Sequence, residues 1–243
     1  MMVYCDWSLS ATTMLRVFSE TNKLIRKAVW LVAFVFLTTM QTVSAHPHVW
    51  IDGHLTLLFN SQGQVTALRH TWKFDELFSA FSLQGITREK NGVIPAAELK
   101  TLTDQWMLNL ADPASHFFTT VSHGGQPIAL QKPVHTQSNL DTQTNQLNLS
   151  FELPLNEPLA LSKQSLEVDV NDPGYFVAFD YKGSQVLTLS EAPSTCRSSH
   201  MPPRPLDSKS QRQLGALTPD QKELPEHLRL LVRQLSHQFK VTC

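Results

Sequence analysis

Two stretches in the first third of the chain alternate apolar and polar residues with a period of two. The first covers residues 48–59 and the second covers residues 64–74. Ser61, Gln62 and Gly63 between them are residues that favour turns. Two alternating stretches joined by a short turn predict a β-hairpin, with one face of each strand directed toward a core.

After this hairpin the apolar spacing becomes helical in residues 75–83 and again in residues 96–110, with a loop between. Beyond Asp112-Pro113 most of the pattern is that of strands, followed by a Pro/Ser-rich stretch and an amphipathic helix. We predict strands at 116–122, 127–130, 146–153, 165–170, 175–181, 186–189 and 239–243, a linker at 192–213 and a helix at 225–234. The expected fold is α+β, with antiparallel sheets, a helix-loop-helix insertion at 75–110 and a short C-terminal helix.

A basic cluster and an apolar run precede the hairpin. Lysine and arginine occur within residues 23–27, residues 28–39 are uncharged and mostly apolar, and small residues occupy 43–45. This order is typical of a secretory signal peptide cleaved after Ala45. A retained membrane anchor is the alternative, but 12 residues are fewer than the roughly 20 that span a bilayer. We therefore expect an exported, periplasmic protein with no membrane span after cleavage.

The predicted organisation has four parts. A signal peptide covers 1–45, the main α+β region covers 46–191, the linker covers 192–213, and a C-terminal helix and strand cover 214–243. Cys196 and Cys243 are the cysteines that remain after the signal segment. In an oxidising compartment they are expected to form a disulfide that ties the C-terminal part back, with free thiols or a metal site as the alternative.

Charge excludes one large class of partner. The formal net charge is -1, whereas a nucleic-acid-binding protein usually carries a basic stripe. We therefore expect no nucleic-acid partner. The hydrophobic content of 42% is ordinary for a folded chain.

Histidines cluster around the predicted hairpin. Cleavage at the predicted site would make His46 the first residue, which would offer an imidazole and an α-amine to one metal ion. In a strand, His48, Asp52 and His54 share a face with it, because side chains alternate. With a three-residue turn, His70 lies opposite His54; a two-residue turn would move His70 to the other face. Imidazole and amine ligands suit nickel, cobalt, zinc or copper, and solvated surface histidines are the alternative.

The predicted helix-loop-helix resembles an EF-hand in part. When Gly92 is placed at the sixth loop position, Thr87, Glu89, Asn91 and Glu98 occupy the first, third, fifth and twelfth positions. The glycine and the final glutamate fit the pattern, but Thr87 stands where an aspartate normally binds calcium. We therefore expect a scaffold that lacks calcium.

Several segments together resemble an uncharacterised family of exported bacterial proteins. The family is often labelled a periplasmic component of an ABC-type transport system and is often encoded beside nickel/cobalt-type metal permeases. The matching segments are His46-Pro-His-Val-Trp-Ile-Asp52, Trp72-Lys-Phe-Asp-Glu76, Asn91-Gly92 with Glu98, Asp172-Pro-Gly-Tyr-Phe176, and Cys243. The resemblance implies metal handling and a membrane metal permease as partner.

These observations favour a transition-metal-binding accessory protein for a membrane metal transporter. We expect no enzymatic activity, because the sequence lacks the signatures of serine hydrolases and zinc proteases. One alternative is a copper-dependent redox enzyme that uses the terminal amine of His46. Another is a structural or adaptor module that binds no metal.

Overall fold

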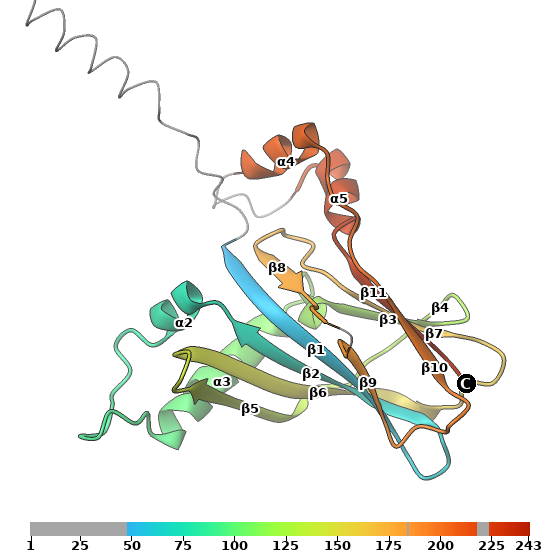
Figure 1. Cartoon of the computed structure of the whole chain (residues 1–243), viewed down its shortest axis with the longest axis horizontal. Coiled ribbons are helices and arrows are strands. Elements are labelled where there is room, and N and C mark those ends of the chain that lie inside the picture. Colours follow the sequence, from blue (N-terminus) through green and yellow to red (C-terminus); the bar gives the residue numbers. More distant parts are fainter. Residues whose placement is uncertain (1–47, 184, 218–223) are drawn as a thin grey trace, which may run out of the picture. The chain divides into compact units, whose positions relative to one another are not determined.

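The computed structural model describes residues 48–183, 185–217 and 224–243, which form two β-sheets and a few short helices (Figure 1). The predicted signal peptide lies outside the described residues. One sheet contains β1 (Val49–Phe59), β2 (Val65–Phe74), β5 (Val134–Asp141), β6 (Gln146–Leu159), β8 (Val177–Asp180) and β9 (Leu187–Ser190). The other sheet contains β3 (Thr119–His123), β4 (Gln126–Ile128), β7 (Leu166–Val170), β10 (Arg197–Met201) and β11 (His237–Thr242).

The strand order is β5-β6-β2-β1-β8 in the six-stranded sheet, with β9 also paired to β1, and β10-β11-β7-β3-β4 in the five-stranded sheet. All pairs are antiparallel except those of β1 with β8 and with β9. The helical elements are α2 (Glu76–Ser82), α3 (Ala96–Leu110), the single turn η1 (His116–Phe118), α4 (Ser208–Gly215) and α5 (Glu226–Arg233). The predicted α+β class, the helix-loop-helix and the short C-terminal helix are confirmed. Within the described ranges, no helix is long and apolar enough to cross a bilayer.

The buried face of the six-stranded sheet is covered by two different layers. Toward the hairpin turn, Leu55 and Leu57 belong to a core that includes Val168 and Phe239 of the five-stranded sheet. Toward the start of β1, the buried residues pack instead against α2 and α3, in a cluster rich in aromatic rings. The layer that covers the sheet therefore changes along β1 between Ile51 and Leu55.

The β1–β2 hairpin contains a bulge that the sequence pattern did not reveal. Near the turn, Phe59 pairs with Val65, but the next pair joins Leu58 to Ala67. Thr66 is therefore an extra residue in β2, and its hydroxyl donates to the carbonyl oxygen of Leu58 at 3.2 Å. Such a bulge shifts the register of all the pairs beyond it by one residue.

The shifted register overturns the predicted pairing of the two histidines. His54 lies opposite Thr71, and His70 lies opposite Leu55. Because side chains alternate along a strand, His54 and His70 lie on opposite faces of the sheet. The expectation that they face each other across the hairpin is wrong.

Several other stretches differ from their predictions, and β5 lies where no strand is predicted. The predicted linker at 192–213 contains β10 and most of α4, and β10 pairs with β11 along its whole length. Four of the five residues of β10 are exposed, so the strand carries little apolar alternation. The strand predicted to start at residue 116 starts at Thr119, because residues 116–118 form the turn η1.

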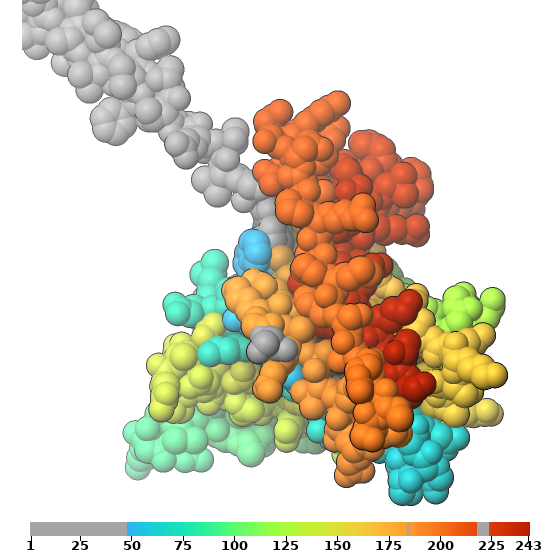
Figure 2. Space-filling view, turned by 45° about the vertical axis from the view of Figure 1, so that its right-hand side comes forward, coloured from blue at the N-terminus to red at the C-terminus, as the bar shows by residue number. Residues whose placement is uncertain are grey.

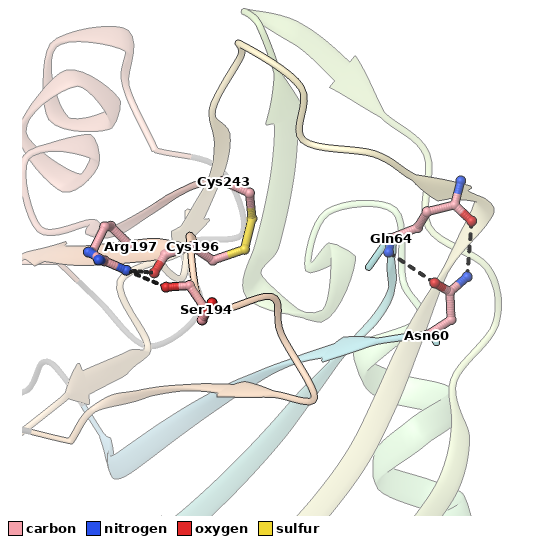
Figure 3. Close-up of a disulfide and its surroundings, with 6 residues drawn as sticks. All are labelled: Asn60, Gln64, Ser194, Cys196, Arg197 and Cys243. Carbon is pink, nitrogen blue, oxygen red and sulfur yellow. Dashed lines mark hydrogen bonds between the residues drawn. A yellow bond between two sulfur atoms is a disulfide. The ribbon is translucent and has the colours of Figure 1, made fainter. Parts of the chain in front are cut away.

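The disulfide between Cys196 and Cys243 is present as expected (Figure 3). It joins the residue before β10 to the residue after β11, two strands that pair directly. Beside it, the Arg197 guanidinium donates to the carbonyl oxygens of Ser194 and Cys196 at 2.8 and 2.7 Å. Figure 2 shows the last part of the chain, in orange and red, as a band that runs down the face turned toward the viewer.

Replacing both cysteines with serine, Cys196→Ser with Cys243→Ser, should destabilise the fold. The disulfide closes a sequence separation of 47 residues, and loss of this constraint on the unfolded chain costs about 3–4 kcal/mol. Urea unfolding of the double variant and of the oxidised wild type measures the difference. Reduced wild type serves as the control and should unfold with the double variant; equal midpoints for the variant and the oxidised protein would contradict the expectation.

Candidate functional site

The loop at residues 172–176 lies directly against the entry to β1. The backbone N–H groups of His48 and Val49 both donate to the carbonyl oxygen of Phe176, at 2.8 and 3.2 Å. The rings of His48 and Phe176 pack with centroids 4.8 Å apart. Two segments more than a hundred residues apart in the sequence therefore meet at the same end of β1.

A third segment reaches this point through Asp75, the residue that caps α2. One oxygen of its carboxylate accepts from the backbone N–H of Phe78 at 2.8 Å, as an N-cap does. The other oxygen accepts from the backbone N–H of Trp50 at 2.8 Å, and the Asp75 N–H donates back to the Trp50 carbonyl at 2.9 Å. We call His48, Trp50, Asp75 and residues 172–176 the β1 corner.

The buried carboxylate of Asp172 shapes the loop of the β1 corner. It accepts three backbone hydrogen bonds of 2.8 Å each, from Gly174, Phe176 and Val177. These bonds fold the loop around one side chain and direct the Phe176 carbonyl toward β1. Asp172 therefore acts first as a structural anchor of the loop.

A cavity of about 220 Å³ adjoins the β1 corner. It is mostly apolar, and its lining includes Trp50, Asp172, Tyr175, Phe179, Pro203 and Leu235. Trp50 is also 54% exposed. The corner thus presents an exposed indole beside a small hollow.

The structure does not bring the predicted metal ligands together. His48 is in the β1 corner, whereas Asp52 and His54 lie farther along the outer face of β1. A strand rises about 3.3 Å per residue, which places His54 roughly 20 Å from His48. His54 contacts the Thr188 hydroxyl at 3.0 Å, and Asp52 lies 3.5 Å from the Lys182 ammonium. One ion cannot bind both histidines, and His46 lies outside the described residues.

His70 is a core residue. Its side chain is fully buried, stacks on Phe151 with centroids 5.1 Å apart, and shares a 3.1 Å hydrogen bond with the Thr119 hydroxyl. Burial lowers the pKa of His70 to about 3, so the imidazole is neutral at physiological pH. His70 faces the core and His54 faces outward, so the two side chains cannot belong to one site.

The predicted calcium loop is an exposed turn closed by its own hydrogen bonds. The Gly92 N–H donates to the Glu89 carbonyl at 2.8 Å, and Asn91 Oδ1 accepts from the Val93 N–H at 2.9 Å. The Arg88 guanidinium donates to the Gly92 carbonyl at 3.1 Å, which places a positive charge on the turn. Thr87 precedes the turn, and Glu98 lies in the first turn of α3. The expectation that this loop lacks calcium stays a prediction.

Among the described residues, no three histidine, cysteine, aspartate or glutamate side chains form a group that could hold a metal ion. The double role of Asp75 is only partly visible in the sequence. Its place just before a helical pattern is the signal of an N-cap. Its second bond, to Trp50, depends on tertiary structure and has no local signal.

A comparison with protein families identifies the chain's relatives. The family DUF1007, described as a protein of unknown function, matches residues 31–243. The chain belongs to this family. An uncharacterized protein of Haemophilus influenzae is 26% identical over 192 residues, which cover 79% of this chain and 89% of the relative. Every described residue, including the β1 corner, therefore lies within the span of the DUF1007 match.

The variant His70→Gln should show a weaker loss of stability on acidification than the wild type. The pKa is about 3 when folded and roughly 6.5 when unfolded, so unfolding takes up a proton between these pH values. His70 therefore lowers the free energy of unfolding by about 2 kcal/mol as the pH falls from about 7 to 5.

Urea unfolding at neutral pH and at pH near 5 measures this effect. The control is His54→Gln, a substitution on the outer face, which should retain the wild-type dependence on pH. Identical pH dependence in His70→Gln and wild type would contradict a buried neutral imidazole.

Proposed function

We propose that this member of the DUF1007 family is an exported accessory protein that binds a transition metal ion at the β1 corner and serves a membrane metal transporter. The observation that supports it most is the convergence at His48. The segments 46–52, 72–76 and 172–176, which carry the resemblance to a metal-associated family, contribute His48, Asp75 and Phe176 to one corner.

The proposed ligands are His46 and His48. Neutral imidazole nitrogens, and the α-amine that cleavage would expose on His46, suit nickel, cobalt, zinc or copper. The backbone at His48 is held by the Phe176 carbonyl, and the backbone at Trp50 is held by Asp75. A ligand on a strand fixed from two sides keeps its position without an ion, which lowers the cost of binding.

A site with few protein ligands suits a protein that passes its ion on. The described residues supply no group of three ligating side chains, so the remaining coordination positions would be filled by water or by a partner. Open positions allow a receiving protein to bind the ion before the donor releases it. This is the property that a donor to a membrane metal permease needs.

The proposed location is the periplasm. A disulfide such as Cys196–Cys243 persists in oxidising compartments and is rare in the cytosol. The predicted signal peptide at 1–45 leads to the same compartment.

Metal-dependent melting of a chain that begins at His46 tests the proposal. Nickel, cobalt, zinc, copper and calcium are compared, and an ion bound only to the folded state adds about 2.7 kcal/mol at a hundredfold excess over Kd. A transition metal should raise the Tm, and the rise should be lost in His48→Ala. His54→Ala, on the same strand, is the matched control and should keep the rise. Binding should weaken below about pH 6, where imidazoles take up protons.

An added glycine before His46 distinguishes the modes of binding. Complete loss of the Tm shift would identify the α-amine as a ligand and favour the alternative of a copper redox enzyme. A Tm shift that persists in His48→Ala, or the absence of a Tm shift with every transition metal, would contradict the proposed site. The second result would leave an adaptor module as the better interpretation.

A further inference from the structure

A cavity of about 420 Å³ lies at one end of the five-stranded sheet, and most of the residues around it are polar or charged types. Three of its lining residues carry ionisable side chains and come from three elements: Arg233 at the end of α5, Asp169 in β7 and His116 in η1. Ser115, Asn171 and Gln238 add hydroxyl and amide groups. The volume is in the range of sites that bind small molecules, and polar groups from separate elements converge on it.

The rim of this cavity is formed by strained backbone. His116, Phe117 and Phe118 have φ values of 46°, 53° and 52°, a left-handed run that side chains disfavour. The aromatic core holds the run in place: the Phe118 ring lies 5.5 Å from that of Phe179, and the Asn171 N–H donates to the Phe118 carbonyl at 2.9 Å. Strain of this kind concentrates at functional sites. Here the left-handed turn places His116 at the cavity.

The carboxylate in the cavity is fixed in orientation. Asp169 Oδ1 accepts from the Gln238 amide at 2.8 Å and from the Ser236 hydroxyl at 3.3 Å. The other oxygen, Oδ2, makes no hydrogen bond to a residue that the structure describes. One face of the carboxylate is therefore available to a donor.

The cation at this cavity is Arg233, and no described carboxylate pairs with it. Arg233 is exposed, and within the described ranges no carboxylate lies within the 4.0 Å of an ion pair with it. By contrast, Arg229, one turn earlier in α5, pairs with Glu226. Arg233 and Asp169 thus line one cavity, and no ion pair joins them.

We propose that this cavity binds a small zwitterion, a free amino acid or a short ω-amino acid, with Arg233 on its carboxylate and Asp169 on its ammonium group. A planar guanidinium matches a carboxylate with two parallel hydrogen bonds, and an ammonium donates to the free Asp169 oxygen. A simple anion would be repelled by Asp169 and a simple cation by Arg233. The polar side chains around them complete the hydrogen bonding of the ligand.

Calorimetric titration of the chain that begins at His46 tests this assignment. The probes are glycine, β-alanine and 4-aminobutyrate, which differ in the distance between their charges, with acetate and ethylammonium as singly charged controls. At least one zwitterion should bind, and the singly charged probes should bind at least about tenfold more weakly. The best spacer length then reports the separation of the two protein charges.

Two substitutions should each weaken zwitterion binding at least about tenfold: Arg233→Gln and Asp169→Asn. Arg229→Gln, which removes a charge from the same helix but not from the cavity, is the matched control and should bind as the wild type does. Because Arg233 is exposed, Arg233→Gln should melt at the wild-type temperature without ligand.

Several results would overturn the assignment. These are no binding of any zwitterion at millimolar concentration, acetate or ethylammonium binding as tightly as the best zwitterion, or undiminished binding by Arg233→Gln. His48→Ala should leave zwitterion binding unchanged, so a failure of metal binding at the β1 corner leaves this test intact.

Discussion

The register of the β1–β2 hairpin depends on one extra residue, Thr66, near the turn. The shift that it introduces directs His70 and Trp72 inward, where both are almost completely buried. It also places Gly53 opposite Trp72. A Cβ on Gly53 would lie 2.5 Å from the ring of Tyr181, so the absence of a side chain there gives the tyrosine its place. Without the bulge, His70 and Trp72 in β2 would be directed outward, away from the core.

The β1 corner depends on a second constraint, the parallel pairing of β8 with β1. Val49 lies beside Val177, and the two strands run in the same direction. Parallel strands are entered from the same end. The residues before β1 and those before β8 must therefore meet, and this is why His48 contacts Phe176. An antiparallel β8 would have carried the 172–176 loop to the far end of the strand.

Local patterns predicted the elements that bury one apolar face: the hairpin, α2, α3 and α5. They missed β5 and β10, edge strands with few buried side chains, because such strands show little alternation. They read Phe117 and Phe118 as part of a strand, because two adjacent aromatic residues look apolar in sequence although the left-handed turn buries them only partly. The predicted pairing of His54 with His70 failed for a related reason. The bulge breaks the alternation of β2 at Ala67 and Leu68, which are adjacent and both buried, but this break alone does not give the alignment of β2 with β1.

The β1 corner and the zwitterion cavity share one stretch of chain, residues 171–177. Asn171 lines the cavity, and its side-chain amide donates to the Val232 carbonyl in α5 at 2.9 Å. The next residue, Asp172, holds the loop that meets β1. A substitution at Asp172 would therefore disturb both regions and could not separate the two functions. His48 and Arg233 each belong to one region alone, and for that reason they are the positions where metal binding and zwitterion binding can be lost independently.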